Sequence, residues 1–162
     1  MARLSPSNYR PILQYHFVVE FTKFGMNLAQ NTQNYARGSD LPSADNNPVS
    51  IEYGNTYIWV KGKTRWNDIT MQFYSLSTPN TNKTLWDYLN AHQAVTDGKD
   101  KFKDEYMGDV VIKLLNPDET QVGTWKLINA MISTINWGVV NWGSDEVIQP
   151  EITFKYDYAE WV

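Results

Sequence analysis

Four stretches of the chain alternate apolar and polar residues with a period of two, which is the spacing of a β-strand that buries one of its faces. These stretches cover residues 13–21, 49–60, 66–74 and 151–158. A fifth run, 110–115, has the apolar composition of a buried strand. Because each of these segments must bury its apolar side, the sequence predicts a β-rich protein with a large surface to cover.

The segment 49–60 carries the clearest local signal, since Gly54-Asn55 is a favoured two-residue turn between its two alternating runs. Pairing Tyr53 with Thr56 fixes the register of this hairpin. Both of its faces then carry apolar groups, so we expect it to lie between two surfaces, one of them on a neighbouring subunit. The candidate subunit-interface residues are Ile51, Tyr53, Tyr57 and Trp59.

One long helix is predicted over residues 84–96, because its apolar residues follow a 3.6-residue period. Residues 84–87 resemble a capping box at its start, and Asp97-Gly98 supplies its end. Trp86 is predicted to be part of the core. The apolar stripe consists of Leu85, Trp86, Leu89, His92 and Val95.

The segment 127–135 fits a helical period as well as a strand, and its β-branched residues favour the strand. A second hairpin is predicted to join the strand 110–115 to one that begins near Gly123, since Asn-Pro-Asp between them is a turn sequence. Polar residues and prolines predict loops over 25–47 and 137–145.

The composition fits a single globular domain spanning residues 1–162, with 42% apolar and 20% charged residues. The formal net charge of -4 has the wrong sign for a surface that neutralises phosphates. Cysteine is absent, which excludes thiol catalysis, Cys-ligated zinc and disulfides. We expect no targeting or membrane-anchoring segment, because the chain holds no run of about 18 apolar residues and no signal-peptide core.

Residues that could carry chemistry are sparse. His16 and His92 are the only histidines, and neither has the neighbouring ligands that zinc requires. Residues 61–64 resemble the end of a phosphate-binding loop, but the upstream glycine of that motif is missing. The carboxylate pairs 104–105 and 145–146 are expected to be solvated loop charges. The sequence therefore predicts no enzyme activity, no catalytic, cofactor-binding or metal-binding residues, and no cofactor.

Taken in order, these elements resemble the tail tube proteins of contractile, T4-like bacteriophages over nearly the whole chain. The more specific points of resemblance lie in residues 15–21, 36–42, 61–73, 86–87, 145–148 and 157–161. Residues around Trp137 and Trp142 match no family motif. For these two tryptophans and for Trp59, packing within the subunit and packing at a subunit interface both remain open.

The resemblance implies a mainly β, antiparallel sandwich or barrel-like subunit with one flanking helix and a long hairpin and loops for assembly. Six subunits would form a ring, and stacked rings would form the inner tube of a virion tail, assembled in the host cytoplasm. Implied partners are the sheath, baseplate and tape-measure proteins, and DNA would pass without specific binding. The alternatives are a type VI secretion tube, a phage-like protein injection particle or a β-sandwich binding module.

The lumen of such a tube is expected to be polar and predominantly acidic, because like-signed walls repel phosphates. The polar faces of two predicted strands provide the candidates. The candidate lumen residues are Thr70, Gln72, Glu151, Thr153 and Asp157.

Overall fold

The computed structural model describes residues 10–22, 36–78, 80–93, 98 and 100–162. It is mainly β and antiparallel, with one long helix. The strands are β1 (Phe17–Thr22), β2 (Ala36–Ser39), β3 (Ala44–Asp45), β4 (Val49–Tyr53), β5 (Thr56–Val60), β6 (Arg65–Trp66), β7 (Ile69–Phe73), β8 (Gly108–Leu115), β9 (Gln121–Asn136), β10 (Glu151–Lys155) and β11 (Tyr158–Trp161); the helices are α2 (Thr81–Gln93) and α3 (Lys103–Tyr106).

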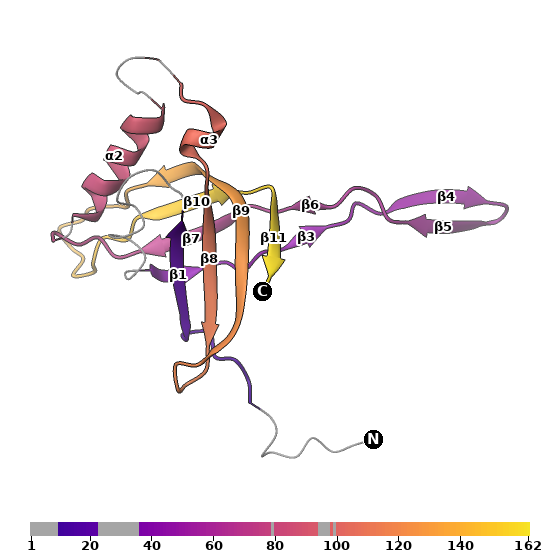
Figure 1. Cartoon of the computed structure of the whole chain (residues 1–162), viewed down its shortest axis with the longest axis horizontal. Coiled ribbons are helices and arrows are strands. Elements are labelled where there is room, and N and C mark those ends of the chain that lie inside the picture. Colours follow the sequence, from indigo (N-terminus) through magenta and orange to yellow (C-terminus); the bar gives the residue numbers. More distant parts are fainter. Residues whose placement is uncertain (1–9, 23–35, 79, 94–97, 99) are drawn as a thin grey trace.

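The main sheet is organised around β9, the longest strand. Its first part pairs with β8 and β11, and its last part pairs with β10, which continues the sheet through β7 to β2. The first part of β9 ends and its last part begins near Asn129, whose φ of 53 lies in the left-handed region. Figure 1 shows β1, β8 and β11 running across the direction of β7 and β10, so the sheet folds over a core. The prediction of a strand over 127–135 is confirmed, because both parts of β9 find pairing partners.

The core lies between the two parts of the folded sheet and is closed by α2. Phe21 stacks on Phe154 with ring centroids 5.7 Å apart, and Phe73 lies 6.1 Å from Phe21. The predicted alternation is therefore confirmed in β1, β7 and β10. The buried apolar residues of these strands, of β8 and β9, and of α2 include Val19, Phe21, Ile69, Met71, Phe73, Leu85, Tyr88, Val110, Ile112, Leu127, Ile152 and Phe154.

Two predicted strands are shorter than their alternating patterns. β1 begins at Phe17, which pairs with Leu114, and β8 ends one residue later at Leu115, whose backbone N–H donates to His16 O at 3.0 Å; β8 therefore offers no partner to the residues before His16. Leu13 and Tyr15 are consequently exposed. At the other end of the chain, β10 stops at Lys155, and Tyr158 begins β11 on the other part of the sheet.

The helix α2 begins at Thr81, earlier than predicted, and Asn80 caps it. The backbone N–H of Lys83 donates to Asn80 Oδ1 at 3.0 Å, which satisfies a free donor of the first turn. The predicted capping box at 84–87 is therefore wrong. Trp86 is 45% exposed, and its prediction as a core residue is also wrong, because Leu85 and Tyr88 form the buried stripe. The predicted helix end at 94–96 lies outside the described residues.

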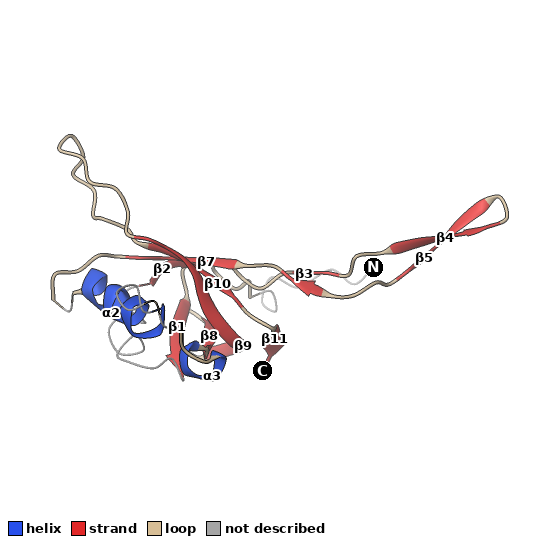
Figure 2. Cartoon of the chain, turned by 90° about the horizontal axis from the view of Figure 1, so that it is seen from above, coloured by secondary structure: helices blue, strands red, loops and turns tan. Residues whose placement is uncertain are grey.

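A long ribbon leaves the main sheet between β2 and β7. These two strands pair with each other, β3 pairs with β6 further out, and β4 pairs with β5 at the tip. Tyr53 faces Thr56 across the turn, and Gly54 has a φ of 60, which confirms the predicted hairpin and its register. We call residues 44–66 the arm; both views show it projecting away from the folded body (Figures 1 and 2).

Candidate assembly surfaces

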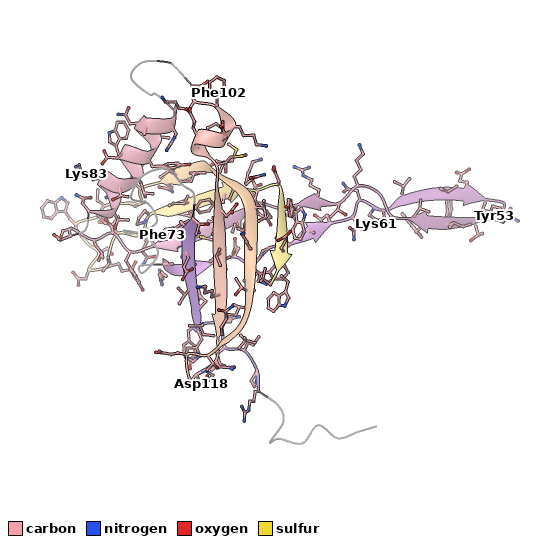
Figure 3. The ribbon with its side chains drawn as sticks, in the orientation of Figure 1. Tyr53, Lys61, Phe73, Lys83, Phe102 and Asp118 are labelled. Carbon is pink, nitrogen blue, oxygen red and sulfur yellow. The ribbon has the colours of Figure 1, made fainter. Side chains whose placement is uncertain are left out.

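The tip of the arm exposes apolar side chains on both of its faces. Every residue of β4 and β5 is exposed, including Trp59 at 68% and Tyr53 at 69%. Tyr53 lies at the far end of the arm in Figure 3. A contiguous apolar surface of this kind marks an interaction site. The predicted interface residues Ile51, Tyr53, Tyr57 and Trp59 all belong to it.

A small polar network joins the two limbs of the ribbon at the root of the arm, and an aromatic contact joins this root to the body. Asn67 Nδ2 lies 3.1 Å from both Ser43 Oγ and Asp45 Oδ2, and its backbone N–H donates to Ser43 O at 3.0 Å. Beside this network, Trp66 packs on Tyr156 with ring centroids 6.1 Å apart, and burial raises the pKa of the Tyr156 hydroxyl. The arm therefore leaves the body in a defined direction.

A polar surface covers the side of β7, β10 and the end of β9 that faces away from the core. Cross-strand pairing puts three threonines in one row and three other polar residues in the row beside it. Within the threonine row, Thr70 Oγ1 lies 3.3 Å from Thr153 Oγ1. We call this surface the polar face; its rows are Thr70, Thr153 and Thr134, and Gln72, Glu151 and Asn136.

Four of the five predicted lumen residues lie on the polar face, and Asp157 does not. Asp157 occupies the corner between β10 and β11, where its backbone N–H donates to Ile128 O at 3.1 Å and its Oδ2 accepts from Asn129 Nδ2 at 2.9 Å. Sequence reasoning missed Thr134 and Asn136. Their alternation in β9 could have indicated them, but the helical period over the same segment obscured it.

The histidines are placed separately from both surfaces. His92 lies on α2, 4.6 Å between ring centroids from Tyr88. The Tyr88 hydroxyl donates to Tyr106 O at 2.6 Å, and burial raises its pKa well above the ordinary value. Among the described residues, no group of three or more His, Cys, Asp and Glu side chains is arranged to hold a metal ion. The described helices include none that is long and apolar enough to cross a membrane.

An antiparallel subunit with a fixed, two-sided apolar arm has the features of a structural protein that assembles with other chains. Residues 13–160 match the family described as T4-like virus tail tube protein gp19. The chain belongs to this tail tube family, and its function is that of a tail tube protein.

Solved structures of contractile injection systems share the fold. A chain of the anti-feeding prophage tube-terminating cap superposes with a TM-score of 0.74 at 18% identity, covering 95% of this chain and 92% of that one. A chain of the PVC sheath-tube complex in the extended state gives 0.70 at 18% identity and 99% of both chains. Hcp1 from Flavobacterium johnsoniae gives 0.51 at 11% identity, over 91% of this chain and 94% of that one. No curated protein matches the sequence.

Proposed function

We propose that six copies of this chain close into a ring and that the rings stack into the inner tube of a contractile phage tail, the conduit for genome ejection. The observation that carries this proposal is the arm, in which every residue of β4 and β5 is exposed although many are apolar. An arm that is fixed at its root and apolar on both faces is stabilised when it lies between subunits.

The edges of the main sheet support ring closure. Within the described residues, β1 pairs only with β8 and β2 pairs only with β7, so each has an unpaired edge. Such edges accept strands from another chain, and a ring of copies would join their sheets into a continuous barrel.

The polar face is the surface that we assign to the lumen. Its hydroxyl and amide groups at Thr70, Thr153 and Gln72 are neutral, and Glu151 adds negative charge. Each copy also brings a net charge of -4 to the ring, so DNA phosphates would be repelled rather than held. Asp157 is left out of this assignment, because its carboxylate is engaged with Asn129 at the corner.

We also propose the domain organisation of the chain, its partner proteins and the cell compartment in which the tube assembles. We assign the whole chain, 1–162, to a single tail-tube domain with a structural, non-enzymatic role. The tube would contact a sheath outside, begin on a baseplate and enclose a tape-measure protein during assembly in the host cytoplasm. Similar chains occur in a solved tube-terminating cap and in a solved sheath-tube complex. These structures support a tube oligomer and a sheath partner for this chain.

A second candidate is a tube that delivers protein rather than DNA. The structural similarity to injection-system chains and to Hcp1 supports this second candidate as much as the shared fold supports a phage tail. Particles purified from the source organism would separate the two: a phage carries a DNA-filled head on the tube, whereas an injection particle or secretion system carries none.

Native mass spectrometry and sedimentation velocity of the purified chain test the ring itself. We expect a species of six times the 18.8 kDa subunit mass, in equilibrium with larger assemblies. A monomer that persists at high concentration across salt conditions would contradict the proposal.

A further inference from the structure

The loop between β9 and β10 stands at the opposite end of the molecule from the arm. Figures 1 and 2 both place the arm at one end of the longest axis and this loop at the other. The loop carries Asp145 and Glu146 and no lysine or arginine. Its apolar side chains are also exposed, with Trp142 at 106% and Val139 at 83%. We call residues 137–149 the acidic loop.

Hydrogen bonds hold the acidic loop in shape. At its tip, the backbone N–H of Gly143 donates to Asn141 Oδ1 at 2.9 Å. At its base, the backbone N–H of Ser75 donates to Ile148 O at 2.9 Å, and Gly138, with a φ of 96, lies against the side chain of Ile148. The loop therefore presents its charge and its apolar groups from a fixed base.

The returning limb of the arm carries the opposite charge. Lys61, Lys63 and Arg65 are all exposed, and residues 57–65 contain no carboxylate. Figure 3 shows Lys61 where the arm narrows. Gly62 lies so close to the backbone of Asn47 that a Cβ would not fit, which brings the two limbs together here. We call Lys61, Lys63 and Arg65 the basic stem.

Among the described residues, neither charged group forms an ion pair, although Asp45 stands opposite Arg65 across the β3–β6 pair. The ion pairs among the described residues involve five other lysines, and none includes the basic stem, Asp145 or Glu146. Within the part of the chain that the structure describes, the acidic loop at one end and the basic stem on the inner half of the arm (Figure 3) thus carry charges of opposite sign that form no ion pair, next to exposed apolar side chains. This is the arrangement of two complementary halves of a head-to-tail contact.

We propose that the acidic loop of one copy docks on the arm of another copy, with Asp145 and Glu146 facing the basic stem and Trp142 covering apolar residues of the arm. A head-to-tail contact of this kind repeats along an axis when its rotation does not close a ring. The proposal rests on the stacked tube proposed above and assigns this contact to the junction between successive rings.

Charge reversal and charge exchange test the electrostatic part. We expect Lys61→Glu with Lys63→Glu, or Asp145→Lys with Glu146→Lys, to raise the concentration needed for tube growth by at least about tenfold while rings still form. Combining all four substitutions should bring it back to within about threefold of the parent. The exposed pair Lys101→Glu with Asp104→Lys, on and beside α3, is the control for the fourfold variant, because both leave the net charge unchanged, and it should change little.

Disulfide trapping tests the contact directly, since the chain has no cysteine of its own. In the variant Lys63→Cys with Glu146→Cys, mild oxidation of tubes should give a ladder of linked chains that continues beyond six. Lys63→Cys with Asp118→Cys is the control, because Asp118 lies on the turn after β8, at the bottom of Figure 3, and should give no ladder.

The outcomes separate this inference from the proposed function. Three results would overturn the docking and leave the proposed tube intact. Tubes could form equally well with either charge set reversed, the fourfold variant could fail to restore tube growth, or oxidised tubes could give no ladder. A parent chain that forms no rings would overturn the proposed function, and the docking with it. Circular dichroism of each variant confirms that its subunit is folded.

Discussion

The indole of Trp161 lies directly over Gly123 and leaves no room there for a Cβ. Trp161 also meets Trp125 edge to face, with ring centroids 5.1 Å apart and an interplanar angle of 71°. The backbone of Val162 exchanges two hydrogen bonds with Thr124 next to this contact, at 2.8 and 3.2 Å. The absence of a side chain at position 123 therefore lets β11 close on β9.

We expect Gly123→Ala to displace Trp161 and to lower the free energy of unfolding by roughly 1–3 kcal/mol, the usual cost of overpacking. Chemical denaturation measures the loss, and hydrogen exchange should show faster exchange of the Val162 amide. Gly38→Ala is the matched control, since no heavy atom lies within 4 Å of a Cβ built there. Equal stability of the two variants would show that Trp161 moves aside at no cost.

Leu85 and Trp86 are neighbours on α2 that should respond very differently to truncation. Leu85 is fully buried, so Leu85→Ala should cost about 2–5 kcal/mol. Trp86 is half exposed and meets Trp137 with ring centroids 6.4 Å apart, so Trp86→Ala should cost only about 1 kcal/mol. Urea denaturation of both variants measures this order, and a larger loss at Trp86 would place that side chain in the core.

Trp59 on the arm should matter for assembly and not for folding. Because the subunit itself does not cover Trp59, Trp59→Ala should block tube growth and leave a cooperatively unfolding subunit. Electron microscopy and thermal denaturation give the two readouts. Phe102→Ala is a suitable control, since Phe102 is also exposed but lies beside α3 (Figure 3). Normal tubes from Trp59→Ala would remove the arm from the subunit interface.

Asp118 should make the β8–β9 turn sensitive to acid. Hydrogen bonds from the Thr120 hydroxyl at 2.6 Å and backbone N–H at 3.2 Å lower the pKa of the Asp118 carboxyl. A lowered folded-state pKa stabilises the protein above the unfolded-state pKa, and that stabilisation is lost as the pH falls through the folded value.

Replacing Thr120 with Val should therefore raise the pKa of Asp118 towards its ordinary value of about 3.9. An NMR titration of the carboxyl carbon measures it. In the parent, the stability difference from Asp118→Asn should be constant above about pH 5 and shrink below about pH 4. An unchanged pKa in Thr120→Val would show that the Thr120 hydroxyl does not hold the carboxylate.

Local patterns predicted the parts of the fold whose register is decided by neighbours in sequence. Gly54 and the alternation on both sides of it specified the hairpin, because a two-residue turn fixes which residues face each other. The buried faces of β7 and β10 followed from alternation alone, and so did four residues of the polar face.

The remaining features depend on contacts that local patterns do not encode. Trp86 fits the helical stripe, but α2 turns Leu85 and Tyr88 towards the core. Asp157 continues the alternation of β10, but the chain leaves that strand to pair with the first part of β9. The placement of the acidic loop and the arm at opposite ends of the molecule (Figures 1 and 2) arises only from the complete topology.

Electron cryo-microscopy of the assembled protein would show the rings, the bore and the contacts of the arm in a single measurement. We expect stacked six-fold rings in which the polar face, with Thr70, Thr153 and Glu151, lines the bore and the arm of each copy lies against a neighbouring subunit. An assembly without a bore, a bore lined by another surface, or arms that project into solvent would contradict the proposed tube.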